Sequence, residues 1–171
     1  AFKWGEAMGV WERIFDFGSG PDTGNFLLTR EGNSNNLRFF YMHARGGGSV
    51  VVPDVIRPEK KMVVTCTVSS SGTSKIWIDG TLRGEAQSGP LTAASIQFSR
   101  TFVGRSNWGG DAYLTGTIYG LEVYDALITP GQVEEQQARF AKLIGAALDV
   151  PSTAAVRYVR IKAASSADAY L

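Results

Sequence analysis

"KMVVTCTVSSSGTSKIWIDG", Lys61–Gly80, predicts a β-hairpin and with it the class of the fold. Residues that favour strands fill both arms, and the serine- and glycine-rich stretch 70–73 between them suits a tight turn. A second turn is expected at Asp79-Gly80, because glycine readily takes the positive φ that such turns require. The single cysteine, Cys66, alternates with apolar neighbours in the first arm and is expected to be a buried small apolar residue.

Most of the remaining chain repeats this pattern of short strands and turns. Runs rich in β-branched and aromatic residues are separated by stretches rich in glycine, serine and asparagine. We expect strands at residues 10–18, 25–31, 37–44, 49–56, 61–69, 75–80, 95–104 and 114–127. Strands at this spacing predict an all-β fold in which two antiparallel sheets pack as a sandwich or jelly roll. The arginine and three glycines at 45–48 are expected to link two of the strands.

One helix is predicted near the C-terminal end. Thr129 offers an N-cap, Pro130 a suitable first helical residue and Gln132 the second half of a capping box. Apolar residues then recur at helical spacing, and Pro151 ends the pattern. The helix is expected to run from about Pro130 to Leu148.

The composition is ordinary for a globular protein and excludes several classes of function. The chain has 171 residues, 44% of them hydrophobic and 19% charged, with a net charge of +1. A balanced charge gives no reason to expect a nucleic acid as partner. No apolar run approaches the roughly 20 residues that a membrane-spanning helix needs, so no membrane insertion is expected.

Four separated motifs carry a resemblance to a known family. They are "WERIFDFGSG" (11–20), "KIWIDG" (75–80), "FVGRSNWGGDAYLTGTIYGLEVYDALIT" (102–129) and "PGQV" (130–133). In this order they resemble the laminin-G-like jelly-roll domains of the concanavalin A-like lectin/glucanase superfamily, over roughly Trp4 to Val133. The resemblance implies two facing antiparallel sheets. Members of this family bind glycans, proteins or calcium, or serve as structural appendages.

The resemblance also suggests how the chain is organised. Residues 1–128 are expected to form the jelly roll without its first strand or strands, which family members usually have before the position of Phe2. Residues 129–149 are expected to form the helix and a linker. The segment "AVRYVRIKAAS" (155–165) resembles the first strand of a discoidin-type, factor 5/8 C-like module. Residues 150–171 are therefore either the start of a second module or a docked tail.

The carboxylates and the single histidine do not form a recognisable catalytic pattern. The glucanases of the superfamily resemble one another in a Glu-x-Asp-x-x-Glu string, which is absent here. Glu12 and Asp16 would lie about 13 Å apart along one strand, at about 3.3 Å per residue, which is too far for a glycosidase pair. Glu122 and Asp125 would point to opposite faces. His43 is expected at the surface, at a strand end. The domain is therefore predicted not to be an enzyme, and a glycoside hydrolase is the remote alternative.

The stretch Val103–Ile118 contains the types of side chain with which proteins commonly bind sugars. A sugar needs an aromatic face for its C–H groups and planar polar groups for its hydroxyls. Trp108, Asn107, Asp111 and Arg105 supply both within seven residues. Trp4, near a predicted loop, is a fifth candidate because it is expected to be exposed.

The same residues also suit a purely structural role. Gly104 would form a tight turn, Arg105 would pair with Asp16 or Glu12, and Trp108 would cover one end of the sandwich. The aromatic residues that alternate on predicted strands are expected to lie mostly in the core. They are Trp11, Phe15, Phe17, Phe39, Tyr41 and Trp77.

Calcium is the metal that the sequence allows, although no cofactor is required. Zinc would need clustered histidine or cysteine, whereas calcium takes carboxylate, amide and carbonyl oxygens. Oxygen-bearing side chains in or beside predicted loops are Asp16, Asp22, Asn25, Asn107 and Asp111. Such residues also cap turns, so both roles remain open.

Two functions from different classes follow. In the first, the domain is a binding or adhesion module of a larger surface protein and recognises a glycan or glycoprotein. In the second, it is a structural part of a large assembly, such as a viral capsid or fibre or a surface filament, and contacts neighbouring subunits. Both place it outside the cell, at the cell surface or on a virion. An exposed aromatic beside polar loop residues favours the first, and a large apolar patch favours the second.

Overall fold

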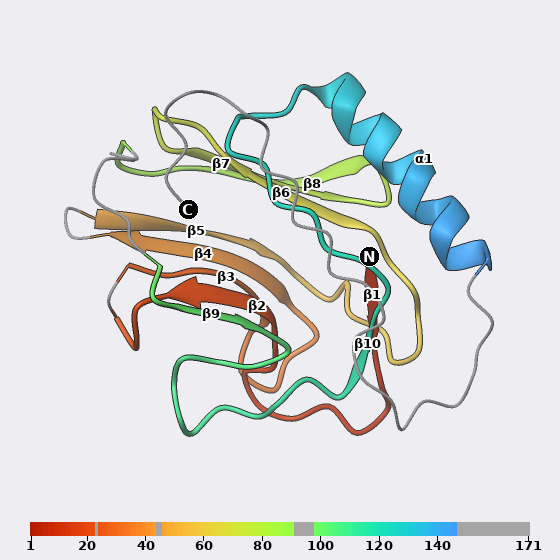
Figure 1. Cartoon of the computed structure of the whole chain (residues 1–171), viewed down its shortest axis with the longest axis horizontal. Helices are drawn as coiled ribbons and strands as arrows, with labels where there is room; N and C mark the ends of the chain where they lie inside the picture. The colour runs from red at the N-terminus through yellow and green to blue at the C-terminus, as the bar shows by residue number, and fades with distance from the viewer. Residues whose placement is uncertain (23, 44–45, 91–97, 147–171) are drawn as a thin grey trace.

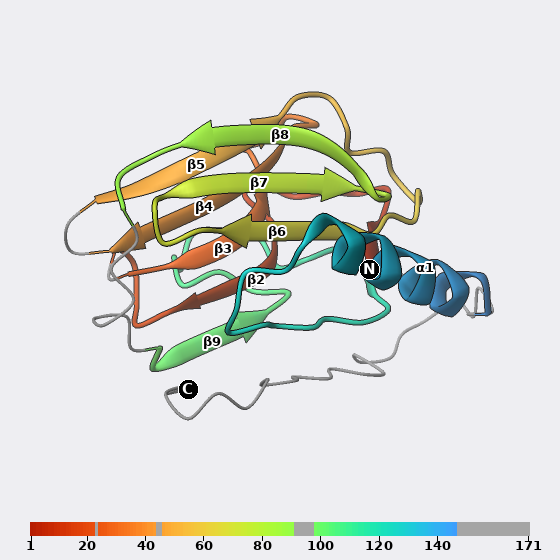
Figure 2. The same ribbon diagram turned by 90° about the horizontal axis from the view of Figure 1, so that it is seen from above.

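The computed structural model describes residues 1–22, 24–43, 46–90 and 98–146, and these form two facing layers of antiparallel strands (Figures 1 and 2). The larger sheet has the order β5-β4-β3-β2-β9 and the smaller the order β6-β7-β8, while β1 pairs with β10. The strands are β1 (Phe2–Trp4), β2 (Arg13–Gly18), β3 (Phe26–Arg30), β4 (Leu37–His43), β5 (Gly46–Val52), β6 (Val64–Val68), β7 (Thr73–Ile78), β8 (Thr81–Gln87), β9 (Arg100–Val103) and β10 (Gly116–Ile118). The predicted antiparallel sandwich with one helix is confirmed.

The hairpin predicted at Lys61–Gly80 is present. β6 pairs with β7 in antiparallel register, with Cys66 opposite Ile76. The second turn follows at Asp79 and Gly80, both with positive φ (51° and 79°), and leads into β8.

The core lies between the two layers and follows the two-residue period of the strands. In β4, Leu37, Phe39 and Tyr41 are buried and point to the same side. The Tyr41 hydroxyl donates a hydrogen bond of 3.4 Å to the carbonyl of Gly72, which joins the larger sheet to the turn before β7. The rest of the buried apolar cluster comprises Phe2, Trp4, Ile14, Leu28, Val50, Val52, Ile56, Met62, Ile76, Ile78 and Ile118.

Helix α1 (Pro130–Ala146) begins as predicted. The backbone N–H of Gln132 donates to Thr129 Oγ1 at 3.3 Å, and Gln132 Oε1 accepts from the N–H of Thr129 at 2.8 Å, which completes the capping box. Val133 and Phe140 are buried on the side of the helix that faces the sandwich, and Arg139 forms an ion pair with Glu122. No helix among the described residues is long and apolar enough to cross a membrane.

Several expectations fall outside the described residues. They concern residues 147–148 of the predicted helix, 95–97 of a predicted strand, 45 of the predicted linker, the module or tail at 150–171 and the side chain of His43. For the rest of the linker the prediction is wrong, because 46–48 belong to β5 and pair with β4.

The prediction of one long strand at 114–127 is wrong. Only Gly116–Ile118 forms a strand there, and it pairs with β1. Residues 121–124 form no ladder, although their apolar and polar residues alternate. Within the described residues, β6 is an edge strand. A cavity of about 420 Å³ lies between β6, the segment 120–128 and the inner faces of β2 and β3.

Cys66 is half-buried rather than fully buried as predicted, lines this cavity and is expected to react slowly with thiol reagents in the folded protein. Burial raises the pKa of its thiol well above the usual range, so the reactive thiolate is scarce at neutral pH. Labelling by a disulfide reagent at pH 8 should be at least ten times slower than in denaturant. Equal rates in the two states would show that the cavity is open to solvent.

Candidate functional site

A pocket of about 300 Å³ lies on the outer face of the larger sheet. Because Leu28 and Phe39 face the core, their neighbours in β3 and β4 point the opposite way. Thr29 stands opposite Arg38 in the ladder. The lining residues are Trp11, Arg13, Asp22, Leu27, Thr29, Arg38, Phe40, Trp108 and Asp111.

Two tryptophans that are far apart in the chain line this pocket. Trp108 comes from the loop after β9, and Trp11 from the turn before β2. The prediction that Trp11 lies on a strand and in the core is wrong. Its φ is +56° and its N–H donates to the carbonyl of Gly32, so the strand begins only at Arg13 and the indole is half-buried at the surface.

Arg13 lies against both indoles and holds the surrounding elements together. Its guanidinium carbon is 5.6 Å from the ring centroid of Trp11 and 5.5 Å from that of Trp108. Nη2 donates to Asp111 Oδ2 at 2.8 Å, and Nη1 donates to Thr29 Oγ1 at 2.6 Å and to the Trp11 carbonyl at 2.8 Å. Burial lowers the pKa of Arg13, but an arginine remains a cation at neutral pH.

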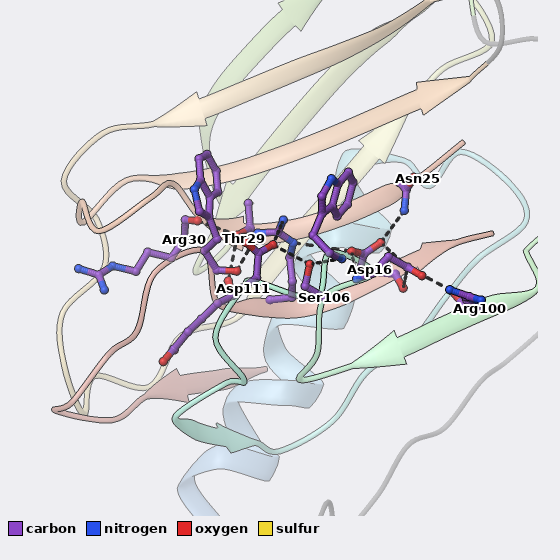
Figure 3. Close-up of polar contacts among 12 residues, drawn as sticks. Asp16, Asn25, Thr29, Arg30, Arg100, Ser106 and Asp111 are labelled. Atoms are coloured by element: carbon purple, nitrogen blue, oxygen red, sulfur yellow. Dashed lines mark hydrogen bonds and ion pairs between the residues drawn. The ribbon is translucent and has the colours of Figure 1, made fainter. Parts of the chain in front are cut away.

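Asp16 anchors the loop that carries Trp108. Its carboxylate is 0% exposed and accepts hydrogen bonds of 2.9 Å from the N–H and Nδ2 of Asn107 and from Nδ2 of Asn25. Figure 3 shows Ser106 between Asp16 and Asp111 in this network. Ser106 Oγ donates to Asp111 Oδ2 at 2.7 Å and accepts from the Trp108 N–H at 3.0 Å. The loop is therefore tied to β2 by buried polar contacts.

The structure separates the predicted sugar-binding residues into different places. Trp108 and Asp111 line the pocket. Asn107 is buried beneath it on Asp16. The expected pairing of Arg105 with Asp16 or Glu12 is wrong. Asn107 and Arg13 contact the carboxylate of Asp16, and Glu12 Oε1 accepts from the backbone N–H of Gly9.

Arg105 instead points to aromatic side chains outside the pocket. Its guanidinium carbon lies 4.7 Å from the ring centroid of Phe102 and 5.7 Å from that of Tyr113. Neither ring lines the pocket.

Trp4 is 1% exposed, so the expectation that it lies at the surface is wrong. It belongs to β1, where it pairs with Gly116, and its ring meets that of Phe2 edge-on at 4.9 Å. Pairing of β1 with β10 directs the indole into the core. The neighbouring residues Gly5 and Glu6 suggested a surface loop, so the sequence alone did not indicate this burial.

Sequence reasoning missed five residues of the pocket besides Trp11. They lie on the outer faces of their strands and are Arg13, Leu27, Thr29, Arg38 and Phe40. The alternation of "LRFFYM" was the available signal, because it puts Arg38 and Phe40 on the face opposite Leu37 and Phe39. In the structure the guanidinium carbon of Arg38 lies 5.0 Å from the ring centroid of Phe40.

The residues predicted for calcium are also divided. Asp16 already accepts N–H donors on both oxygens, and Asn25 donates to it. Asp22 and Asp111 line the pocket. Within residues 1–22, 24–43, 46–90 and 98–146, no three side chains of the types His, Cys, Asp and Glu are grouped as metal ligands.

Comparisons with known proteins identify one family model and a distant structure. The model is described as laminin G 3, of the concanavalin A-like lectin/glucanases superfamily, and matches residues 3–134. No curated protein matches the chain. A crystal structure of an S-layer domain-containing protein (residues 221–444) from Clostridium thermocellum shares 20% sequence identity. The match covers 80% of this chain and 67% of that chain, with a TM-score of 0.41.

Proposed function

Because the chain belongs to the concanavalin A-like lectin/glucanase superfamily, by the match of residues 3–134, we propose that it is a non-catalytic domain that binds carbohydrate. The observation that carries this proposal is the pocket lined by Trp11 and Trp108. The two indoles offer apolar surfaces against which the C–H face of a pyranose ring packs. Charged groups beside them can bind the hydroxyls.

The size and polar groups of the pocket suit a short stretch of glycan. Its volume of about 300 Å³ is near the lower limit of about 300–1,000 Å³ for small-molecule sites. We therefore expect it to hold one or two sugar rings of a longer chain. Arg38 can donate to hydroxyl oxygens, and Asp22 can accept from hydroxyl groups.

We further propose that the pocket performs no hydrolysis. A glycosidase needs one carboxyl group as proton donor and a second as nucleophile or base. Asp22 and Asp111 are the carboxylates of the lining. Asp111 Oδ2 already accepts from Arg13 and Ser106, so this oxygen is held as an acceptor and is not available to protonate a leaving group.

Replacing either tryptophan by alanine should weaken glycan binding while leaving the fold intact. Loss of one stacking contact of about 1 kcal/mol or more predicts a drop in affinity of at least five-fold. A glycan array would identify the ligand, and calorimetry on Trp11→Ala and Trp108→Ala would measure its affinity. Running each titration with calcium and with chelator also tests whether binding needs the metal.

Tyr113→Ala provides the matched control for Trp108→Ala. Tyr113 is 66% exposed on the chain segment that follows the same loop, but it does not line the pocket. Its loss should leave the affinity unchanged. Full affinity in both tryptophan variants, or equal loss in Tyr113→Ala, would refute the assignment of the pocket.

We propose that the domain acts at a cell or virion surface, as a module of a larger protein. The alternative is a structural role in an assembly, for which a contiguous apolar patch would be the expected sign. The large exposed apolar side chains of the described residues come from seven different segments. They are Val10, Val51, Leu82, Phe98, Tyr113, Leu127 and Leu143. Phe98 and Leu127 nevertheless line the same cavity beside β6. The carbohydrate-binding role is therefore favoured by the pocket lined by Trp11 and Trp108, not by the distribution of these side chains.

A further inference from the structure

We infer that the pocket selects uncharged sugars over acidic ones and that Asp22 imposes this choice. The inference rests on the proposed carbohydrate-binding function and adds the class of ligand. It follows from how the charged groups that line the pocket are paired.

Each arginine of the pocket has its own acidic partner. Nη2 of Arg13 lies 2.8 Å from Asp111 Oδ2, and its Nε lies 3.7 Å from Asp16 Oδ2. Arg38 lies 3.8 Å from Glu31 Oε1, and its Nε donates to Ser49 Oγ at 3.0 Å. The two positive charges are thus balanced by carboxylates that the protein itself supplies. Neither arginine therefore has an unpaired charge with which to neutralise an acidic ligand.

Asp22 differs from the other carboxylates of the pocket. It is exposed and lies in a turn with a φ of +56°, and its side chain forms no ion pair or hydrogen bond within the described part of the chain. The uncompensated charge of the lining is therefore negative. An acidic group placed beside Asp22 would be repelled, whereas a pair of sugar hydroxyls would donate to its oxygens.

The place beside the two indoles where a cationic ligand would bind is already occupied by a side chain of the protein. Paired tryptophans can form an aromatic cage for a cationic ligand. Here the Arg13 guanidinium takes that place, at 5.6 and 5.5 Å from the two rings. The remaining ligand class is an uncharged sugar whose C–H face meets the indoles.

The test compares the wild-type domain with Asp22→Asn on matched pairs of sugars. Each pair consists of a neutral sugar and its C6-oxidised acid, namely glucosyl and glucuronosyl, galactosyl and galacturonosyl, and mannosyl and mannuronosyl groups on one linker. Asparagine tolerates the left-handed backbone of this turn, so the variant is expected to fold. Glu134→Gln, an exposed change of the same charge on α1, is the control.

The wild type is expected to bind the neutral member of its preferred pair at least ten times more tightly than the acid. Asp22→Asn should reduce this ratio several-fold, and Glu134→Gln should not. The ratio should also fall at about 1 M salt, where the screening length is about 3 Å. Equal binding of both members by the wild type, or an unchanged ratio in Asp22→Asn, would overturn the inference but leave the proposed function standing. No binding of any sugar would overturn both.

Discussion

Replacing Asp16 by alanine is expected to lower the free energy of unfolding by about 3–5 kcal/mol, the usual cost of breaking a buried charged pair. The carboxylate is fully buried and accepts from Asn107 and Asn25. Its removal takes the acceptor from the buried backbone N–H of Asn107 and one of two acidic neighbours from Arg13. Unpaired buried groups carry the full cost of their lost hydration. The loss is large against a typical total of about 5–15 kcal/mol.

Glycan binding should fall in the same variant, because Asp16 holds the loop that carries Trp108. Denaturant unfolding measures the stability, and calorimetry below the melting temperature measures the binding. Asp125→Ala removes an exposed carboxylate and is the control, with an expected change within about 0.5 kcal/mol. An Asp16→Ala domain as stable as the control would show that the loop is held by other contacts.

Trp4→Ala is expected to destabilise the domain by about 3–5 kcal/mol, as for other buried aromatic residues cut to alanine. The indole is 1% exposed and packs on Phe2 where β1 joins the core. The ring of Trp4→Phe fills much of the same space, and the Trp4 indole N–H has no partner to lose among the described residues. That variant should therefore be clearly more stable than Trp4→Ala.

The contrast with Trp108→Ala separates a core tryptophan from a binding one. Trp4→Ala should lower the melting temperature and leave the affinity of the folded fraction unchanged. Trp108→Ala should do the reverse. Thermal melts and calorimetry on the two variants provide both readouts. A Trp4→Ala domain with an unchanged melting temperature, or one that folds but no longer binds glycan, would contradict this division.

Local features of the structure were predictable because neighbours in the chain determine them. The hairpin at Lys61–Gly80 depends on strand-forming arms and on turn residues within a few positions. The start of α1 depends on Thr129 and Gln132, which are one helical turn apart. The antiparallel sandwich follows from repeating such local signals along the chain.

The location of individual aromatic side chains was not predictable in the same way. Trp4 was expected outside and lies in the core, while Trp11 was expected inside and lines the pocket. An alternating pattern defines two faces of a strand but does not say where the strand begins. Trp11 lies in a turn with positive φ, so the alternation starts after it.

The sequence by itself determined the fold class, the hairpin and the helix start, and it singled out Trp108 and Asp111, which line the pocket. Only the tertiary structure decided which residues share the pocket. Trp11, Arg38 and Trp108 meet because β2 pairs with both β3 and β9, and β3 pairs with β4. Such pairings join segments far apart in the chain, and their register depends on how the whole apolar face is buried. That burial is a property of the assembled sandwich, which no short stretch of sequence contains.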